Sequence, residues 1–399
     1  MDSHTPALLL HILLLLLALP AVLSSGYLLL AALLSQRLPV PRPQSRQRFF
    51  DIIVPAHNEA AVIARTVASL RKIDWPAERL RIIVCADNCT DETAAAARAA
   101  GAAVIERHDP TRRGKGYALD FAFQSSRASG LADAVVIIDA DAEVSPNLLE
   151  AIAARLEGGV QAVQVHYGVL NPMASWRTRL ITIAKGAVHI VRSRARERLG
   201  LSCGIRGTGW CVTHQLLQAV PYQAFSLTED VEYGIDLGLA GYRVAYADEA
   251  DCDAEMVSNE QSARTQRQRW ERGRFQLMRT RTWPLLKAAV QRRSAVCLDL
   301  ACDLLVLPIS YVALNIIAMI AAAALAAQWF SGMQAWLYLS AACALSLMCY
   351  VLRGWQLSTI GLIGLIDLAR APGFLLWKLT LLARTQKSKG WERTDRESP

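Results

Sequence analysis

The stretch VVIIDAD, from Val135 to Asp141, decides how the chain is interpreted, because it joins an apolar run to two acidic side chains. The β-branched run predicts a buried strand of an α/β sheet. Alternate residues of an extended chain point the same way, so Asp139 and Asp141 can face one divalent cation. An ordinary acidic turn is the alternative, because a lone D-x-D pair has little specificity.

Two similar units precede this stretch. Ile52 to Val54 and Ile82 to Cys85 are short apolar runs, and each is followed by polar residues and then by helix-like sequence. Strands that alternate with helices predict a mainly parallel α/β sheet with ligand sites at the carboxyl ends of its strands. The motifs at those ends are PAHNE (Pro55 to Glu59) and ADNCTDE (Ala86 to Glu92). For either motif alone, helix capping by its Asn or Thr is an equal alternative.

Two further motifs carry charge next to flexible or helix-starting sequence. In RRGKGY, from Arg112 to Tyr117, basic side chains among glycines can approach a phosphate closely, although a solvated basic turn is the simpler reading. The spacing does not fit a Walker A loop. In LTED, from Leu227 to Asp230, a carboxylate could take a proton from an attacking hydroxyl, or it could only complement the dipole of the following helix.

The segment QRQRW, from Gln266 to Trp270, lies in an arginine-rich run. At helical spacing, Gln266, Arg269 and Trp270 share one face and could bind an anion together. A basic amphipathic helix that rests on a membrane is the alternative, and the two uses are compatible.

Composition limits the class of protein. Of 399 residues, 53% are hydrophobic and 20% are charged, which excludes a disordered chain, a collagenous rod and a small cysteine-stapled scaffold. The net charge of +8 suits an anionic ligand or a membrane surface, and no nucleic-acid partner is implied. The nine cysteines include no CxxC pair, so we expect neither structural disulfides nor a zinc ribbon.

The apolar residues are concentrated near the two ends of the chain. The stretch from Ser3 to Gln36 contains no Asp, Glu, Lys or Arg and exceeds the ~20 residues of a spanning helix. A cleaved signal peptide is the alternative, but the run is too long and lacks a basic start. By the positive-inside rule, the basic residues that follow predict that the next segment lies on the cytoplasmic side of the cell (inner) membrane. These residues are Arg37, Arg42, Arg46 and Arg48.

Three apolar stretches lie near the other end. Leu304 to Ala327 and Trp336 to Leu352 are predicted spans. Ile360 to Leu382 is interrupted by charges and a proline, so we expect an interfacial or re-entrant element. The interrupting residues are Asp367, Arg370 and Pro372, and the basic residues of the tail are Arg384, Lys387 and Lys389. The predicted parts are a membrane anchor and basic linker (1–48), a cytosolic α/β domain (49–290) and a C-terminal membrane region (291–399).

Taken in this order, the motifs PAHNE, D-x-D, T-E-D and Q-x-x-R-W resemble those of the family 2 glycosyltransferases of the GT-A fold. The similarity is to the membrane-bound branch with cellulose, chitin and hyaluronan synthases and ceramide glucosyltransferases. It spans roughly Phe50 to Met278, and the flanking apolar segments agree with it. One departure is Asn88-Cys89, where the family often has a second acid followed by Gly or Ser.

The resemblance implies a role for each matching residue. Asp230 would be the general base, and Asp141 with Asp139 would hold a divalent metal, Mg²⁺ or Mn²⁺. The nucleotide-sugar would be bound by Pro55, Glu59, Asp87, Lys115, Asp139, Gln266, Arg269 and Trp270. The acceptor side would be formed by Cys203, Gly204, Glu229 and Trp270, of which the loop at Cys203 is the looser match.

The implied reaction is inverting transfer of a sugar from a nucleotide-sugar, expected to be UDP-linked, to a lipid or saccharide acceptor beside the membrane. Single transfer in glycolipid or exopolysaccharide assembly is favoured, because about three spans from one copy hardly build a polysaccharide channel. A processive polysaccharide synthase is the alternative. Alternatives of other classes are a non-catalytic membrane subunit or transporter and a nucleotidyl- or phosphoryltransferase. The sugar, the base, the acceptor and the oligomeric state stay open.

Overall fold

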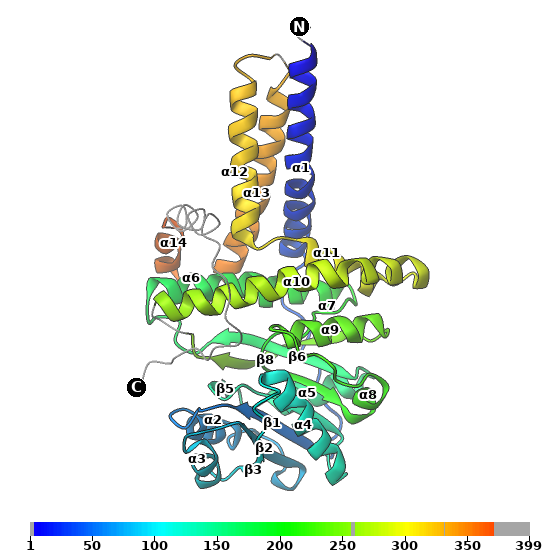
Figure 1. Ribbon diagram of the computed structural model, residues 1–399, viewed down its shortest axis with the longest axis vertical. Coiled ribbons are helices and arrows are strands. Elements are labelled where there is room, and N and C mark those ends of the chain that lie inside the picture. The colour runs from blue at the N-terminus through cyan, green and yellow to red at the C-terminus, as the bar shows by residue number, and fades with distance from the viewer. Residues whose placement is uncertain (1–3, 257–259, 331, 371–399) are drawn as a thin grey trace.

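The computed structural model describes residues 4–256, 260–330 and 332–370 of the chain. It consists of an α/β domain with long helices standing on one side of it (Figure 1). Three described helices are long and apolar enough to cross a membrane. They are α1 (His4–Leu33), α12 (Ile309–Ala326) and α13 (Gln334–Leu357).

One mixed sheet forms the centre of the domain. Its order is β3-β2-β1-β4-β7-β6-β8-β5. The first four strands are parallel, as are β6 and β8, whereas β7 runs antiparallel to both of its neighbours and β5 runs antiparallel to β8. The strands are β1 (Phe50–Ala56), β2 (Leu80–Asp87), β3 (Ala103–Arg107), β4 (Ala134–Ile137), β5 (Ala142–Val144), β6 (Ala162–Val169), β7 (Trp210–Thr213) and β8 (Val244–Ala254).

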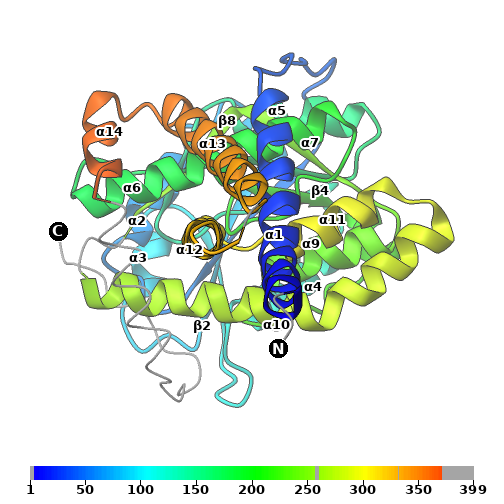
Figure 2. The ribbon, with the colours of Figure 1, turned by 90° about the horizontal axis from the view of Figure 1, so that it is seen from above.

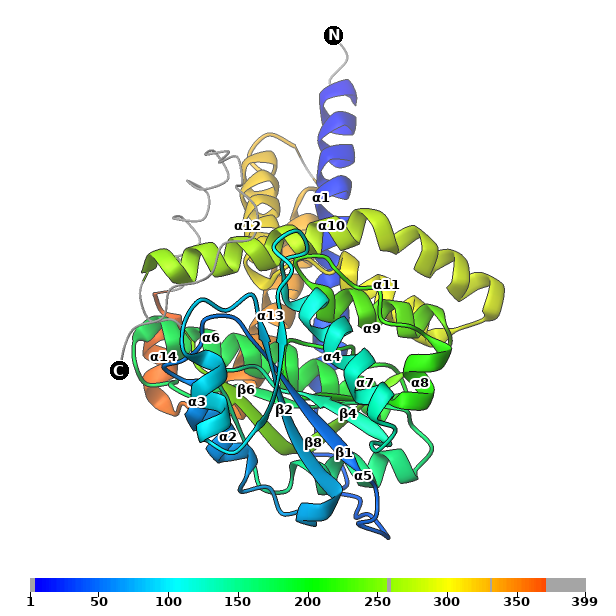
Figure 3. The same cartoon turned by 60° about the horizontal axis from the view of Figure 1, so that its bottom comes forward.

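Helices cover both faces of this sheet, because successive strand residues point to opposite sides. Ile52 and Val54 pack with α2 and α5 on one face, whereas Ile53 packs with α4 and α9 on the other. Figure 3 shows α2 and α3 on one side of β1 and β2, with α4 on the other. The helices named here are α2 (Ile63–Leu70), α3 (Thr93–Ala99), α4 (Lys115–Ser129), α5 (Leu148–Glu157) and α9 (Glu229–Leu239).

The expected α/β class with a mainly parallel sheet and terminal apolar helices is confirmed. The predicted strands at Ile52 to Val54 and Ile82 to Cys85 lie within β1 and β2. Each carries an unbroken apolar core, which is typical of a strand buried on both faces. The strands β3, β5, β6, β7 and β8 were not predicted. Of these, the short antiparallel strands β5 and β7 carry no turn or alternation signal of their own.

A layer of helices separates the sheet from the long apolar helices (Figure 1). These are α6 (Trp176–Lys185), the π-helical η2 (Gly186–Val191), α7 (Arg192–Arg198), α10 (Glu260–Arg292) and α11 (Ala295–Leu305). The long apolar helices pack against η2 and α7 in one apolar cluster that includes Leu28, Val191 and Tyr350. The remaining short helices of the described chain are η1 (Ala77–Arg79), α8 (His214–Ala219) and α14 (Leu362–Leu368).

The predicted start of the second apolar span was wrong. Leu304 belongs to α11, and α12 begins only at Ile309. Pro308 separates the two helices, because it lacks an N–H group and pushes the preceding residue out of helical conformation. The third span is longer than predicted, since α13 extends from Gln334 to Leu357.

The predicted interfacial stretch begins as the short helix α14, which lies against α6 in the view from above (Figure 2). The buried carboxylate of Asp367 pairs with Arg179 of α6 at 2.5 Å, which explains a charge in an apolar segment. The rest of this stretch, with Pro372 and the basic tail, lies outside the described residues. The domain limits stay predictions, and the one at residue 290 falls inside α10.

Candidate active site

One large cavity of about 1220 Å³ lies between the sheet and the apolar helices. Residues from β1, β2, α4, α9, α10, α12 and α13 line it. Most side chains that the sequence singled out lie on its wall. They are Pro55, Glu59, Asp87, Lys115, Asp139, Asp141, Glu229, Asp230, Gln266, Arg269 and Trp270.

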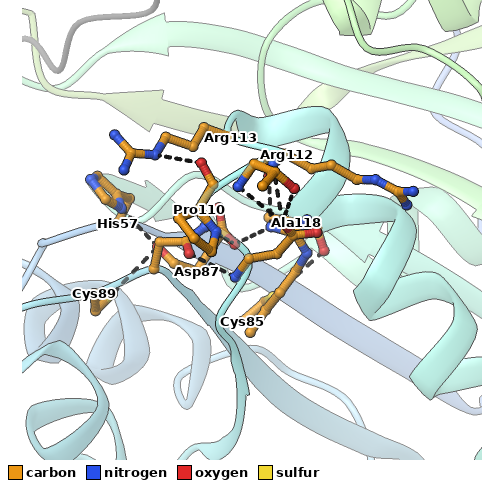
Figure 4. Close-up of polar contacts among 12 residues, drawn as sticks. His57, Cys85, Asp87, Cys89, Pro110, Arg112, Arg113 and Ala118 are labelled. Atoms are coloured by element: carbon orange, nitrogen blue, oxygen red, sulfur yellow. Dashed lines mark hydrogen bonds and ion pairs between the residues drawn. The ribbon is translucent and has the colours of Figure 1, made fainter.

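The ends of β1 and β2 form the part of the wall where a nucleoside was expected. The carboxylate of Asp87 is buried and pairs with Arg107 at 2.6 Å. Nδ1 of His57 donates to the carbonyl oxygen of Asp87 at 2.7 Å, which ties the two strand ends together. Figure 4 shows His57 beside Asp87, with Arg112 and Arg113 in the loop after β3. The basic loop and the acidic strand ends therefore meet at one place.

Lys115 at the first turn of α4 joins two of the acidic motifs. Its Nζ lies 2.5 Å from Oδ1 of Asp139 and 3.7 Å from Oε1 of Glu229, and it donates to the carbonyl oxygen of Gly207 at 2.8 Å. Burial disfavours the charged amine, but the two carboxylates outweigh burial and hold the pKa of Lys115 above its ordinary value. Burial also raises the pKa of Glu229 to about 7, although Lys115 acts in the opposite direction.

Asp139 and Asp141 follow β4 and point into the cavity from the turn before β5. The backbone N–H of Asp139 donates to Oγ1 of Thr208 at 2.9 Å, which fixes this turn against the neighbouring loop. Among the described residues no three His, Cys, Asp or Glu side chains gather as a metal cage. Two carboxylates in an open cavity suit Mg²⁺ or Mn²⁺, which share their ligands with substrate phosphates. The carboxylates of Asp139 and Asp141 therefore fit a cation that binds together with a diphosphate.

Asp230 lies in the first turn of α9, where its carboxylate accepts a hydrogen bond from the backbone N–H of Gly207. Gly207 has φ of +64°, and a Cβ there would lie 2.8 Å from the ring of Tyr167. A glycine is therefore required for this close approach. The hydrogen bond orients the carboxylate of Asp230 in the cavity.

The helix α10 places Gln266, Arg269 and Trp270 on the cavity wall, as the helical spacing predicts. Nε of Arg269 is buried and has no hydrogen-bond partner among the described residues. Trp270 is 38% exposed, so its ring borders the opening of the cavity rather than its floor. A buried guanidinium N–H without a partner suits an anionic ligand.

The structure places the predicted acceptor-side residues Cys203 and Gly204 outside the lining of the cavity. The Cys203 side chain is fully buried in the apolar core under the sheet, where burial raises the pKa of its thiol to about 12. Neither residue lines the cavity, whereas Arg206 and Gly207 of the same loop do. Side-chain directions in this loop depend on glycine turns at positive φ, which the sequence motif leaves open.

The sequence also missed Lys185 at the end of α6. Its Nζ lies 3.1 Å from the centre of the Tyr167 ring and donates to the carbonyl oxygen of Gly168 at 3.0 Å. Burial lowers the pKa of Lys185 to about 7, although Asp141 opposes this shift. A lysine next to an otherwise apolar helical stretch was the available signal.

The side of the cavity next to the long apolar helices was missed as well. Trp176 and Leu180 of α6, Ala313 of α12, and Leu347 and Val351 of α13 contribute to this wall. No motif marks these residues, because they occupy ordinary positions of helices. The cavity thus continues from the acidic site to the apolar helices.

The family described as "Glycosyltransferase like family 2" matches residues 47–273. This match covers more than half of the chain and contains every motif discussed above. The chain belongs to this family. The expected resemblance to the family 2 glycosyltransferases of the GT-A fold is thereby confirmed.

Several curated relatives show what the enzyme is similar to. The β-monoglucosyldiacylglycerol synthase of a Synechocystis species is 28% identical over 247 residues, which cover 59% of this chain and 49% of that protein. A probable glucomannan 4-β-mannosyltransferase of Oryza sativa is 23% identical over 245 residues, covering 57% of this chain and 43% of that protein. The chain spans about half the length of the curated relatives it matches.

A solved structure shares the fold of this glycosyltransferase. The mannosyltransferase PcManGT of Pyrobaculum calidifontis, determined in complex with GDP-Man and Mn²⁺, superposes with a TM-score of 0.53 and 19% identity. The superposition covers 85% of this chain and 98% of that one. The likeness concerns the fold, a GT-A-like sheet combined with long apolar helices.

Proposed function

We propose that this family 2 glycosyltransferase is an inverting, metal-dependent hexosyltransferase that moves a sugar from a UDP-sugar to a membrane lipid. The observation that carries the proposal is the continuous cavity, whose wall includes Asp139, Asp141 and Asp230 at one end and apolar side chains of α12 and α13 at the other. A polar donor and a lipid acceptor can thus meet in one space. The relative that makes β-monoglucosyldiacylglycerol supports a lipid acceptor.

Asp230 is the proposed general base. Its carboxylate, oriented by the N–H of Gly207, takes the proton of the acceptor hydroxyl as the oxygen attacks the anomeric carbon. The carbon–oxygen bond to the donor phosphate breaks on the opposite side, so an α-linked donor gives a β-linked product. A base that contributes to this step typically accelerates it ~10²–10⁴-fold.

Cationic groups stabilise the leaving diphosphate in this proposal. Asp139 and Asp141 would hold Mg²⁺ or Mn²⁺, which neutralises charge on the diphosphate. Arg269 donates hydrogen bonds to the diphosphate from α10, and Lys115 lies close enough to Asp139 to approach the phosphates or the sugar. Pro55, Glu59 and Asp87 line the nucleoside end of the cavity, and Gln266 and Trp270 border it. Glu229 stands on the acceptor side.

We place the α/β domain at the cytoplasmic face of the cell membrane. The arginines after α1 support this orientation through the positive-inside rule. The three apolar helices then hold the cavity against the bilayer, where a lipid can enter between α6, α12 and α13. This arrangement favours one or few transfers over processive synthesis, since three spans from one copy do not enclose a wide channel.

A panel experiment tests the proposal. The full-length enzyme in a maltoside detergent is incubated with single UDP-sugars, a lipid acceptor and Mg²⁺ or Mn²⁺, and UDP release and product mass are measured. We expect one donor to give acceptor-dependent UDP release and a lipid that carries one added hexose. Long products from a single binding event would favour the processive alternative. Absence of UDP-sugar binding and of release with every donor would contradict the proposal.

A further inference from the structure

Four arginines gather at the membrane side of the cavity, and the transfer reaction proposed above leaves them without a role. We call them the arginine cluster, and its members are Arg192, Arg196, Arg206 and Arg274. They come from α7, from the loop before β7 and from α10. Arg192, Arg206 and Arg274 line the cavity, whereas Arg196 lies behind them.

Two acidic side chains of α11 hold the arginine cluster together. The carboxylate of Asp303 pairs with Arg192 at 2.9 Å, with Arg196 at 2.9 Å and with Arg206 at 3.6 Å. Asp299 pairs with Arg196 at 2.9 Å. The guanidinium of Arg274 has no carboxylate partner of its own in the described part of the chain, and it donates to the carbonyl oxygen of Val306 at 2.8 Å and to that of Asp303.

The arginine cluster carries an excess of positive charge. Four guanidinium groups face two carboxylates, which leaves two positive charges uncompensated. Burial lowers the pKa of Arg274 to about 10, despite Asp303, so Arg274 stays charged at neutral pH. Burial would raise the pKa of Asp303, but the arginines hold it well below its ordinary value. His189 adds no further positive charge, because burial and Arg206 push its pKa well below the usual range.

Such an excess is costly away from water unless an anion balances it. The side chains of Arg192 and Arg196 are 4% and 3% exposed, and that of Arg206 is 12% exposed. Guanidinium groups match the oxygen geometry of a phosphate better than any other side chain does. The chemistry of the arginine cluster therefore fits a phosphate that enters through the cavity.

The position of the arginine cluster connects the proposed base with the membrane helices. Arg206 directly precedes Gly207, whose N–H donates to Asp230. On the other side, Nε of Arg192 donates to the hydroxyl of Tyr350 in α13 at 2.9 Å. Val306, which accepts from Arg274, stands just before α12. An anion held here would lie between the base and the apolar wall.

We propose that the arginine cluster binds the phosphate of a phosphate-bearing lipid acceptor, with the acyl or prenyl chain along the apolar wall of α12 and α13. This inference rests on the proposed function and narrows its acceptor class. A neutral lipid would leave the two excess charges uncompensated. Two sources share this chemistry: a glycerophospholipid such as phosphatidylglycerol, whose free hydroxyl would attack the sugar as proposed above, and a polyprenyl phosphate, whose own phosphate oxygen would form the new bond to the anomeric carbon.

The test compares acceptors for the full-length enzyme in a maltoside detergent, which contains no phosphate. The acceptors are polyprenyl phosphate, polyprenol, phosphatidylglycerol and diacylglycerol, with the donor that the UDP-sugar panel identifies. At least one phosphate-bearing lipid should show a KM about tenfold or more below that of its neutral counterpart, as loss of a charge-assisted hydrogen bond predicts. The lipid that is glycosylated identifies the source of the phosphate.

Variants assign this effect to the arginine cluster. Arg274→Gln should raise the KM of the phosphate-bearing lipid about tenfold or more and leave UDP binding unchanged, whereas Arg274→Lys should largely restore the KM. The control is Arg279→Gln, because Arg279 is exposed on the same helix and does not line the cavity. If Arg274→Gln does not fold, as its melting curve would show, Arg206→Gln takes its place with the same expectation.

Three results would overturn the inference. The first is an equal KM for phosphate-bearing and neutral lipids in the wild type. The second is an Arg274→Gln variant that weakens UDP binding and leaves the lipid KM unchanged, because the cluster would then serve the leaving group. The third is transfer to none of the four lipids while the UDP-sugar still binds, which would also overturn the proposed lipid acceptor.

Discussion

Lys115 and Asp139 form an ion pair at the point where the motifs of the first and second halves of the domain meet. The nearby carboxylate of Glu229 places three charged groups from three separate segments within one small space. Such a concentration of acidic groups is costly without cations. A lysine and a divalent metal are the two sources of positive charge that this site can use.

The residue that tests the metal contribution most cleanly is Asp141. Replacing Asp141 by Asn removes one of the two carboxylates that would hold Mg²⁺ or Mn²⁺, so we expect metal-dependent UDP binding to weaken about tenfold or more. Titration calorimetry with UDP, with metal and with a chelator, measures the effect. Glu143→Gln is the matched control, because Glu143 lies two residues away, pairs with Arg65 and does not line the cavity. Equal UDP affinity with and without metal in the wild type would contradict this role.

At the scale of single residues, sequence reasoning succeeds where a motif ends a strand or starts a helix. Asp87 and Asp139 were expected on one wall because the carboxyl ends of parallel strands meet at one edge of the sheet, and Asp230 because it stands at the start of a helix. The arginine cluster was not found, since Arg192 and Arg274 are far apart in the sequence and meet only through tertiary packing. Asp299 and Asp303, four residues apart in an apolar helix, were the signal that could have indicated it.

At the scale of elements, the contact between α13 and η2 is unusually close. A Cβ on Gly354 of α13 would lie 2.7 Å from Cβ of Ala187 and 2.9 Å from its backbone nitrogen. Gly186 of η2 faces the backbone of Gly354 in turn, since a Cβ there would lie 2.6 Å from its carbonyl oxygen. Two glycines thus allow the long apolar helix α13 to dock on the α/β domain next to the cavity.

We therefore expect Gly354→Ala to destabilise the enzyme by about 1–3 kcal/mol through overpacking. The readout is the melting temperature of the purified protein in detergent. Gly26→Ala is the control, because Gly26 lies inside α1 and a Cβ there would meet nothing within 4 Å. Alanine favours a helix by about 0.5–1 kcal/mol over glycine, so this control should melt at the same or a higher temperature. A Gly354→Ala variant with the melting temperature of the control would contradict this prediction, because α13 could then move away from η2 without loss of stability.

The elements themselves were largely predictable, because uninterrupted apolar runs specify both the central strands and the long helices. The break at Pro308 shows where the prediction failed. Hydropathy continues through this proline, so composition alone merges α11 with α12, whereas backbone chemistry separates them. The order of the strands in the sheet could not be predicted from the sequence, because β7 pairs with β4 and β6 through contacts that no local pattern encodes.

At the scale of the whole molecule, the α/β domain and the apolar helices α12 and α13 share one cavity. A donor made in the cytoplasm and a lipid in the bilayer would reach this cavity from different directions. The donor can reach the cavity only if the domain lies on the cytoplasmic side, as the arginines after α1 predict.

Reporter tags test this orientation in cells. A tag at the exposed Leu131 turn should be protected from external reagents, whereas a tag between α12 and α13, next to Trp329, should be accessible from outside. Labelling of intact and of permeabilised cells measures the difference. The opposite pattern, with Leu131 labelled in intact cells, would contradict the proposed side.

The role of Asp230 as general base is tested by comparing turnover and donor binding in Asp230→Asn. We expect transfer to fall ~10²–10⁴-fold, because the base is lost, while the affinity for the UDP-sugar stays that of the wild type. Asp236→Asn serves as the control, since Asp236 lies on the same helix, pairs with Arg281 and does not line the cavity. Wild-type turnover in Asp230→Asn with unchanged donor affinity would contradict the account.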